Sequence, residues 1–280
     1  IVTASGCGAP VIVDLYADID VDPTTTPTPV ETVIPTPEPA RTCFVDDDGV
    51  LLVDVPSLLS DTRCFDHVAA QRPSAQMISY DVNAPLWTDG ATKRRCLTLP
   101  QGATIAFAQD DPWALPVGSA IAKTFASPLD GQNVETRFLL HRSAGLWETW
   151  SYAWNADGTD ATLRNMSASE TIAFGAYQHV YPSGNQCVTC HSDAGSAAPL
   201  GLKTAQLNRS RSGEQENQIS ELESMGLFSQ ALPLDPDALP AMALPTVLAT
   251  DTPALAAIKG RSYLDANCSH CHRPDGTCAS

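Results

Sequence analysis

A five-residue pattern, Cys-x-x-Cys-His, occurs twice in this chain of 280 residues and constrains its fold more than any other feature. It reads CVTCH at 187–191 and CSHCH at 268–272. Side chains three or four positions apart are neighbours on a helical turn. The fold must therefore present two thiols and an imidazole together, and it must do so at two separate places in the sequence.

Such a turn suits the covalent attachment of haem c. Two thiols can form thioether bonds to the two vinyl groups of one haem, and the histidine can then give its imidazole to the iron. We therefore expect two haem c groups. The expected attachment cysteines and axial histidines are Cys187, Cys190 and His191 at the first site and Cys268, Cys271 and His272 at the second.

A zinc site is the main alternative explanation of the two motifs. Two Cys pairs can form a tetrathiolate site, but the usual gap between such pairs is roughly 15–20 residues. Here 77 residues lie between Cys190 and Cys268. Zinc also leaves His191 and His272 without a role, and a thioredoxin-like redox pair would need a βαβ setting that this sequence lacks.

Composition divides the chain into three regions, at 1–42, 43–180 and 181–280. The first ends in DPTTTPTPVETVIPTPEPART (22–42), which is typical of an extended Thr/Pro-rich tether. The second carries β-branched and aromatic runs with an Asp-Gly hairpin signal at 157–158. We expect the second region to be an antiparallel sandwich or partly open barrel.

After residue 180 the pattern is helical. A capping box at Ser212 and Gln215 predicts one helix. The stretch 251–267 predicts another, which begins at Asp251 or Thr252 and runs directly into the second motif. The expected fold is therefore α+β: a β-rich sandwich or barrel-like domain, followed by a small, mainly helical cytochrome c-like dihaem region.

The net charge of −16 argues against nucleic acid or anionic lipid as partners. No apolar run is long enough to span a bilayer, so we expect no transmembrane segment. Nine cysteines in an acidic chain indicate an oxidising compartment or a cofactor role. We expect an extracytoplasmic protein, whether periplasmic, on the outer surface or extracellular.

The sequence around the second motif, GRSYLDANCSHCHRPDG, resembles the first helix and haem-binding turn of class I cytochromes c. A wider resemblance, over roughly residues 57–276, is to a poorly characterised family of secreted bacterial dihaem proteins. The stretches that carry it, in this order, are YDVNAPLWTDGATKRRCLTLPQG, PVGSAIAKTF, VETRFLL, SYAWN, YPSGNQCVTCH, PLGLKTAQLNR and RSYLDANCSHCHRPDG. Some relatives are fused to sugar-dehydrogenase-like propellers, which implies that they accept electrons.

Each motif supplies only the fifth ligand of its own iron, so the sixth ligand must come from elsewhere in the sequence. Relatives continue past the second motif through a Met-Pro ligand, whereas this chain has eight residues after His272, so we expect another ligand there. His179 precedes Cys187 by eight residues and can fold back over a haem, or it can simply be a polar residue at a strand end. His270 can reach a neighbouring haem. The candidates are His67, His179, His270 and Met242, the last in the Pro-flanked stretch LPAMALP.

The expected function is electron transfer by two haems, with no catalytic residues. The protein is expected to serve redox partner proteins, and a dihaem peroxidase or an electron acceptor for a periplasmic dehydrogenase are the alternatives. Four of the nine cysteines lie in the motifs, and an odd number of five remains. An odd cysteine and an apolar porphyrin face favour a homo-oligomer or polymer, such as a subunit of an extracellular cytochrome filament.

Outside the motifs we expect a disulfide between Cys64 and Cys96, whose flanking segments a β domain can bring together. A second expected pairing is Cys7 with Cys43, which bracket the tether.

Overall fold

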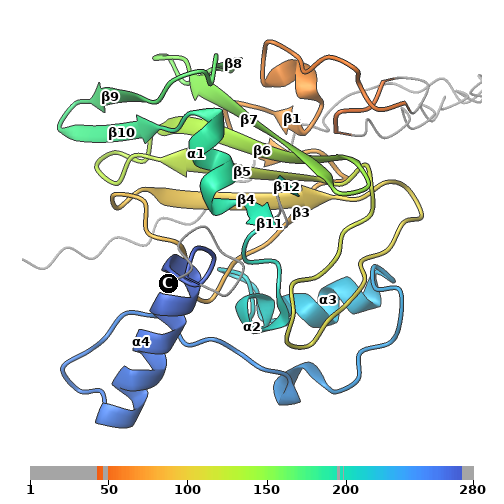
Figure 1. The fold of residues 1–280 in the computed structure, drawn as a ribbon, viewed down its shortest axis with the longest axis vertical. Helices are drawn as coiled ribbons and strands as arrows, with labels where there is room; N and C mark the ends of the chain where they lie inside the picture. The colour runs from red at the N-terminus through yellow and green to blue at the C-terminus, as the bar shows by residue number, and fades with distance from the viewer. Residues whose placement is uncertain (1–42, 47–49, 194–195, 198, 273–280) are drawn as a thin grey trace, which may run out of the picture. The chain divides into compact units, whose positions relative to one another are not determined.

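The computed structural model describes residues 43–46, 50–193, 196–197 and 199–272, all of which belong to one compact unit. An antiparallel sheet runs through this unit; one helix lies across the sheet in this view and the others lie below it (Figure 1). The expected Thr/Pro-rich tether at 22–42 lies outside the described residues.

Six strands form the main sheet, and each pairs with the next one along the chain. Gly145, with φ 73°, turns the fourth hairpin of this meander, and Gly158, with φ 68°, turns the fifth. The Asp-Gly hairpin signal is thus confirmed, since positive φ is what glycine supplies most easily. The strands are β3 (Ile78–Ser79), β4 (Thr92–Thr98), β5 (Ala120–Ala126), β6 (Asn133–Ser143), β7 (Leu146–Trp154) and β8 (Ala161–Leu163).

The sheet is open, because β3 and β8 are its two edges. The other described strands form only two-stranded pairs, so the expected sandwich or barrel is replaced by one twisted meander. A chain that is mostly β with a few helices agrees with the expected α+β class. The pairs are β1 (Phe65–His67) with β2 (Arg72–Pro73), β9 (Glu170–Phe174) with β10 (Tyr177–Tyr181), and β11 (Ser192–Asp193) with β12 (Ser196–Ala197).

Each face of the sheet has its own core. On one face, Cys96, Ala122 and Phe138 lie opposite one another on β4, β5 and β6 and pack against Phe44 and Leu59. Successive side chains of a strand point to opposite faces. The odd-numbered residues of β4, β5 and β6 therefore point to the second face, which short helices cover.

On this second face, Leu97, Ile121 and Leu139 form an apolar row beneath two short helices. Their common core contains residues from both sides of residue 180, where we expected a domain boundary. The helices are α2 (Thr204–Leu207) and α3 (Gln218–Ser224), and a 3-10 turn, η2 (Pro236–Ala238), follows; another, η1 (Ser60–Thr62), precedes β1.

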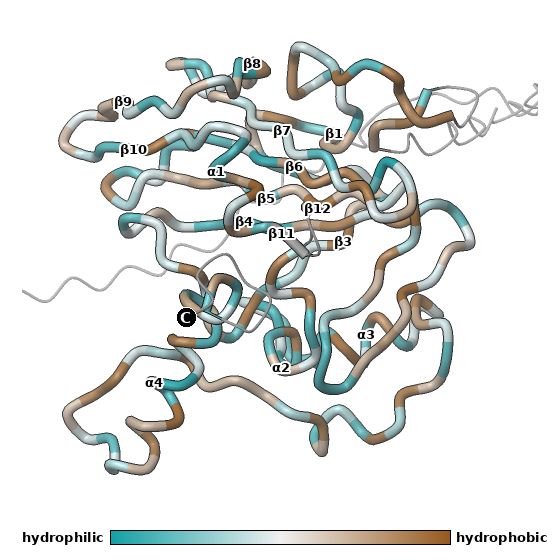
Figure 2. The backbone as a smooth tube through the Cα atoms, viewed as in Figure 1, coloured by the Kyte–Doolittle hydropathy of each residue, from teal (hydrophilic) through white to brown (hydrophobic). Residues whose placement is uncertain are grey.

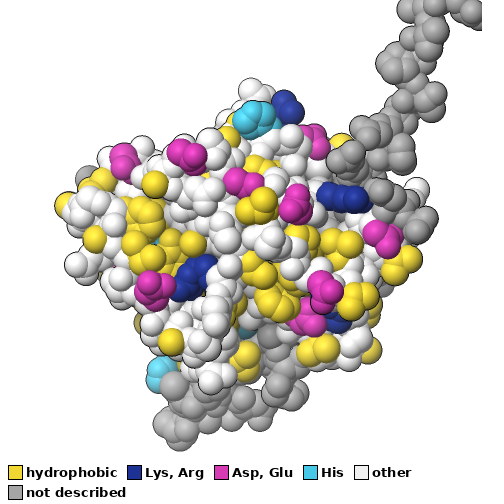
Figure 3. All heavy atoms as spheres, turned by 90° about the horizontal axis from the view of Figure 1, so that it is seen from above, with side chains coloured by type: hydrophobic (Ala, Val, Ile, Leu, Met, Phe, Trp, Pro, Cys, Tyr) yellow, Lys and Arg dark blue, Asp and Glu magenta, His cyan; other side chains and the backbone are white. Residues whose placement is uncertain are grey.

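The helix predicted at 251–267 is confirmed as α4 (Pro253–Asn267). The side chain of Thr252 caps it by accepting a hydrogen bond from the backbone N–H of Leu255 (3.2 Å). None of the described helices has the length and hydrophobicity that a membrane span needs. On the face seen from above, acidic side chains are dispersed among hydrophobic patches (Figure 3), in keeping with the negative net charge.

The predicted start of α3 is wrong. Asn217 is the N-cap, and its side-chain oxygen accepts from the N–H of Ile219 (2.9 Å). The backbone N–H of Ser212 instead donates to Asp81 (2.8 Å), which holds Ser212 in a loop.

The predicted disulfide between Cys64 and Cys96 is also wrong, because Cys64 is joined to Cys43. The N–H of Phe44 donates to the carbonyl of Thr62 (3.0 Å), which brings the two half-cystines together. This pairing also excludes the expected link of Cys43 to Cys7, a residue outside the described part of the chain. Cys96 stays a thiol inside β4, and its burial raises its pKa to about 12.

Candidate functional site

The first motif forms the end of helix α1 (Gly184–Cys190). Ser183 and Gln186 make a reciprocal capping box at its start. At its end, the backbone N–H of His191 donates to the carbonyl of Cys187 (2.9 Å). Cys187, Cys190 and His191 therefore share one helical turn, as the spacing predicts.

The second motif repeats this turn at the end of α4. Cys268 is the C-cap, and the N–H of His272 donates to its carbonyl, again over 2.9 Å. The N–H of Cys271 donates to the same carbonyl (3.1 Å). The two motifs thus share this closing hydrogen bond, although Cys187 and Cys190 lie within α1 and the second motif follows the end of α4.

The fold brings the two motifs into contact. The ligand atoms of Cys190, His270 and Cys271 all lie within 4.8 Å of one another, and all three residues are half-buried. The thiol of Cys271 also lies 4.0 Å from the backbone carbonyl of Thr189 in the first motif. Among the described residues, this is the one group of three or more Cys, His, Asp or Glu side chains close enough to hold a metal ion.

A cavity of about 580 Å³ adjoins the first motif. Pockets for cofactors and drug-sized ligands are commonly of this size. Its walls come from helix α1, from the α2/α3 face of the sheet and from the start of the second motif. The lining includes Cys187, Cys190 and His191 from the first motif, Ser269 and His270 from the second, and Phe125, Leu139 and Thr149 from the sheet.

Cys187 points toward the sheet and is buried. Burial raises the pKa of its thiol, while the positive charge of Arg137 and the hydroxyl of Thr149 act in the opposite direction. Arg137 lies on β6 and Thr149 on β7, so the first motif is packed directly against the sheet.

His179 lies in a buried network apart from the cavity. Its Nε2 is 2.7 Å from a carboxylate oxygen of Glu135, and its Nδ1 is 3.0 Å from the hydroxyl of Tyr177. Both ring nitrogens are therefore engaged, and His179 is 1% exposed. The structure supports its interpretation as a polar strand residue rather than as a sixth ligand.

Glu135 organises this network. It is fully buried and receives hydrogen bonds from Arg137 (2.7 and 2.6 Å), Ser151 (2.6 Å) and His179. Burial opposes its ionisation, but the Arg137 guanidinium and the three hydrogen-bonding side chains outweigh burial and lower its pKa to about 2. Glu135 is thus a carboxylate at neutral pH.

The other ligand candidates are placed differently from one another. His67 is exposed on β1, where its Nδ1 accepts from the N–H of Ala70 (3.1 Å). Met242 is half-buried, its N–H donates to Ala205 (2.7 Å), and it does not line the cavity. His270, a residue of the second motif, is the candidate that lines the cavity and lies close to Cys190 of the first motif.

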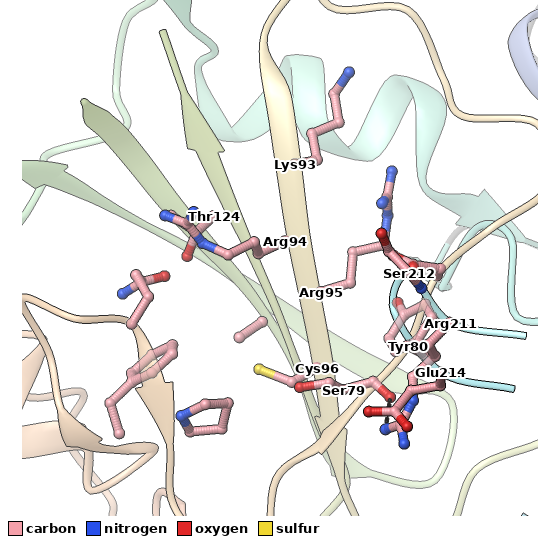
Figure 4. Close-up of a pocket in the computed structure, with 15 residues that line it drawn as sticks. Ser79, Tyr80, Lys93, Arg94, Arg95, Cys96, Thr124, Arg211, Ser212 and Glu214 are labelled. Atoms are coloured by element: carbon pink, nitrogen blue, oxygen red, sulfur yellow. Dashed lines mark hydrogen bonds between the residues drawn. The ribbon is translucent and has the colours of Figure 1, made fainter. Parts of the chain in front are cut away.

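Sequence reasoning missed a set of cations on the sheet. Arg95, Lys123 and Arg137 line the cavity from three neighbouring strands. Arg95 also lines a smaller cavity of about 390 Å³ at the β4 edge, shown in Figure 4. A lysine inside the apolar run AIAKTFA was the available signal, since an isolated charge in a buried strand requires an explanation.

No protein-family model, curated protein or solved structure matches the chain. The resemblance to secreted dihaem proteins is therefore carried by the motifs quoted above.

Proposed function

We propose that this chain carries two c-type haems, one at each Cys-x-x-Cys-His turn, and transfers electrons. One observation carries the proposal. Two turns of identical spacing, each closed by a hydrogen bond from the histidine N–H to the carbonyl of the first cysteine, converge from 81 residues apart, so that Cys190 and Cys271 adjoin. Two attachment points this close favour electron exchange between the groups that they hold.

The first site has the chemistry that a haem requires. Cys187, Cys190 and His191 line a cavity that strands of the sheet also line. Phe125 and Leu139 make the lining from the sheet apolar in part, which suits a porphyrin ring. At the second site, haem attachment is supported by the turn that contains Cys268, Cys271 and His272.

When bound, each haem would supply one-electron oxidation and reduction. The protein's own part is to hold the group and to set its potential through axial ligands, burial and nearby charge. His191 and His272 are the proposed axial histidines. His270 is the best-placed sixth ligand for the first haem, and Met242 stays a prediction.

The proposal is tested by intact mass and by the pyridine haemochrome spectrum. The protein should exceed its polypeptide mass by two haems, and both haems should resist extraction by acid acetone. Cys187→Ala with Cys190→Ala should remove one haem. Cys96→Ala is the matched control, because this buried cysteine lies outside both motifs, and it should keep both. A colourless protein would overturn the proposal.

A metal-ion site is the second candidate, and the cluster of Cys190, His270 and Cys271 favours it. Zinc is bound by cysteine and histidine in structural sites, usually with four ligands. The described residues supply three here. Stoichiometric zinc in a colourless protein, lost in Cys271→Ala, would establish this candidate in place of haem.

The proposed location is outside the cytoplasm, because a disulfide such as Cys43–Cys64 persists in oxidising compartments.

Redox partners or further copies of the chain have an apolar surface available next to the second motif. Hydrophobic residues recur along α4 and the segment before it (Figure 2), and contiguous exposed apolar surface marks contact sites. The exposed side chains are Leu244, Val247, Leu248, Leu255, Ile258, Tyr263 and Leu264.

An oligomer or a cytochrome filament is the assembled form that we propose on this basis. Electron microscopy of native material tests it, and particles of one chain's mass at every concentration would contradict it. A hydrogen peroxide assay separates the carrier from a dihaem peroxidase, whose active haem would need an open sixth position.

A further inference from the structure

A row of three cations crosses the sheet beneath the first motif. In the strand register, Arg95 on β4 lies opposite Lys123 on β5, and Lys123 lies opposite Arg137 on β6. Neighbouring strands are about 4.8 Å apart, and like charges placed directly opposite one another destabilise a sheet. The fold itself does not require three cations in one row. Their mutual repulsion would be relieved by a negative charge nearby.

The compensation that the described residues provide is incomplete. Glu135 forms an ion pair with Arg137 (2.6 Å). In the described part of the chain, neither Arg95 nor Lys123 forms an ion pair, although the charge of Asp81 acts on Arg95 and that of Glu135 acts on Lys123. The ammonium of Lys123 instead lies 5.0 Å from the ring centroid of Phe125. Burial, followed by the charges of Arg95 and Arg137, lowers the pKa of Lys123 well below its usual value.

Lys93 adds to the excess of positive charge on this face of the sheet. It lies two residues before Arg95 on the same face of β4, and its ammonium donates to the carbonyl of Leu86 (2.9 Å) rather than to an acid. Burial, Arg95 and Arg137 together lower its pKa to about 8. Figure 4 shows that Lys93 and Arg95 project to one side of β4, whereas Arg94 projects to the other.

The row borders an apolar row on one side. Two positions further along the strands lie Leu97, Ile121 and Leu139, whereas the row on the other side places buried Phe125 between Lys93 and Glu135. The cavity that these cations line is also lined by Cys187 and His191. A fitting ligand is therefore a largely apolar group that carries negative charges along one edge.

We propose that Arg95, Lys123 and Arg137 form a subsite for the carboxylates of the ligand in this cavity. On the function proposed above, these are the two propionates of the haem attached at Cys187 and Cys190. A free dicarboxylate offers the same chemistry without that function. Carboxylates would supply the charge that the row lacks, and hydrogen bonds between charged partners are the strong ones.

The test compares Lys123→Met and Arg95→Gln with Arg94→Gln in the intact protein. Arg94 is the matched control, since it carries the same charge on the same strand but faces away. Loss of a subsite cation leaves a propionate charge uncompensated, which favours ferric iron and lowers the potential of one haem. A tenfold change in that equilibrium corresponds to 59 mV for one electron. Arg94→Gln should leave both potentials in place.

The effect of Lys123→Met on the melting temperature should have opposite signs with and without the ligand. In the Cys187→Ala, Cys190→Ala protein, which lacks the first attachment site, Lys123→Met should raise the melting temperature because it removes a like-charge contact. In the intact protein it should lower the melting temperature. Two haems with potentials and melting temperatures equal to those of the control would overturn the subsite and leave the proposed function standing.

If the protein carries no haem, the proposed function fails and the subsite is tested with a free ligand. Succinate should then raise the melting temperature of the native chain and not of Lys123→Met, which would support the carboxylate subsite. An equal response of both proteins would overturn it.

Discussion

Cys190 and Cys271 place their sulfur atoms within 4.8 Å of each other, although Cys190 ends α1 and Cys271 lies in the turn after α4. Polar contacts at the end of α4 hold this arrangement. The side chain of Asn267 accepts from the N–H of Trp87 (2.6 Å), and the hydroxyl of Ser262 accepts from the N–H of Ala243 (3.0 Å). Lys203 forms an ion pair with Asp265. Among the described residues of α4, only Ser262 is buried, so the helix is positioned by these contacts more than by an apolar core.

The true start of α3 gives the first prediction. Asn217→Ala should destabilise the protein by about 1 kcal/mol, since it removes the side chain that caps the helix. Ser212→Ala is the control, because Ser212 is the cap that sequence alone suggests. Urea denaturation measures the free energy of unfolding of both variants. An equal or larger loss of stability for Ser212→Ala would contradict Asn217 as the N-cap of α3.

Glu135 predicts how stability depends on pH. Its pKa is depressed to about 2 in the folded protein, from an ordinary value of 4.5. Its stabilising contribution is therefore present above pH 4.5 and is lost as the pH falls from there toward 2. The size is about 3 kcal/mol, from 1.36 kcal/mol for each pKa unit.

Glu135→Gln should remove this part of the pH dependence and should be destabilised at pH 7. Glu221→Gln, which breaks the partly exposed pair with Arg211, is the matched control and should cost at most about 1 kcal/mol. The free energies of unfolding of the native protein and both variants, measured at pH 7 and pH 3, test this prediction. A Glu135→Gln protein as pH-sensitive as the native one would contradict the network.

The disulfide gives the third prediction. Replacing Cys43 and Cys64 together by serine should cost roughly 3 kcal/mol, because the bridge closes a loop of 21 residues in the unfolded chain. Cys96 should resist alkylation until the protein unfolds, since its thiol is buried and its pKa is about 12. Peptide mapping without reduction identifies the bridge, and a Cys64–Cys96 peptide would refute the pairing.

Local features of this fold could be predicted from sequence because local geometry determines them. The spacing of each motif predicts a helical turn, Gly158 predicts a hairpin, and Thr252 with Pro253 predicts the start of α4. Each of these depends on hydrogen bonds or dihedral angles within a few residues. The structure bears out all three.

The long-range features could not be predicted in the same way. Cys64 pairs with Cys43 rather than with Cys96 because a backbone contact of Phe44 selects its neighbour. His179 is engaged by Glu135, which lies 44 residues away and gives no local signal. The row of cations becomes visible only when the register of three strands is known. Contact between the two motifs likewise depends on the whole path from α1 to α4.

That contact gives the last prediction, which depends on the presence of both haems. Two paramagnetic irons attached at adjoining turns should interact, and reduction of one should make reduction of the other less favourable. The electron paramagnetic resonance spectrum of the oxidised protein should therefore differ from the sum of two single-haem spectra. Those come from Cys187→Ala with Cys190→Ala and from Cys268→Ala with Cys271→Ala, and Cys96→Ala should keep the native spectrum. A native spectrum equal to the sum would mean that the haems do not interact, and the proximity of Cys190 to Cys271 would then have no redox consequence.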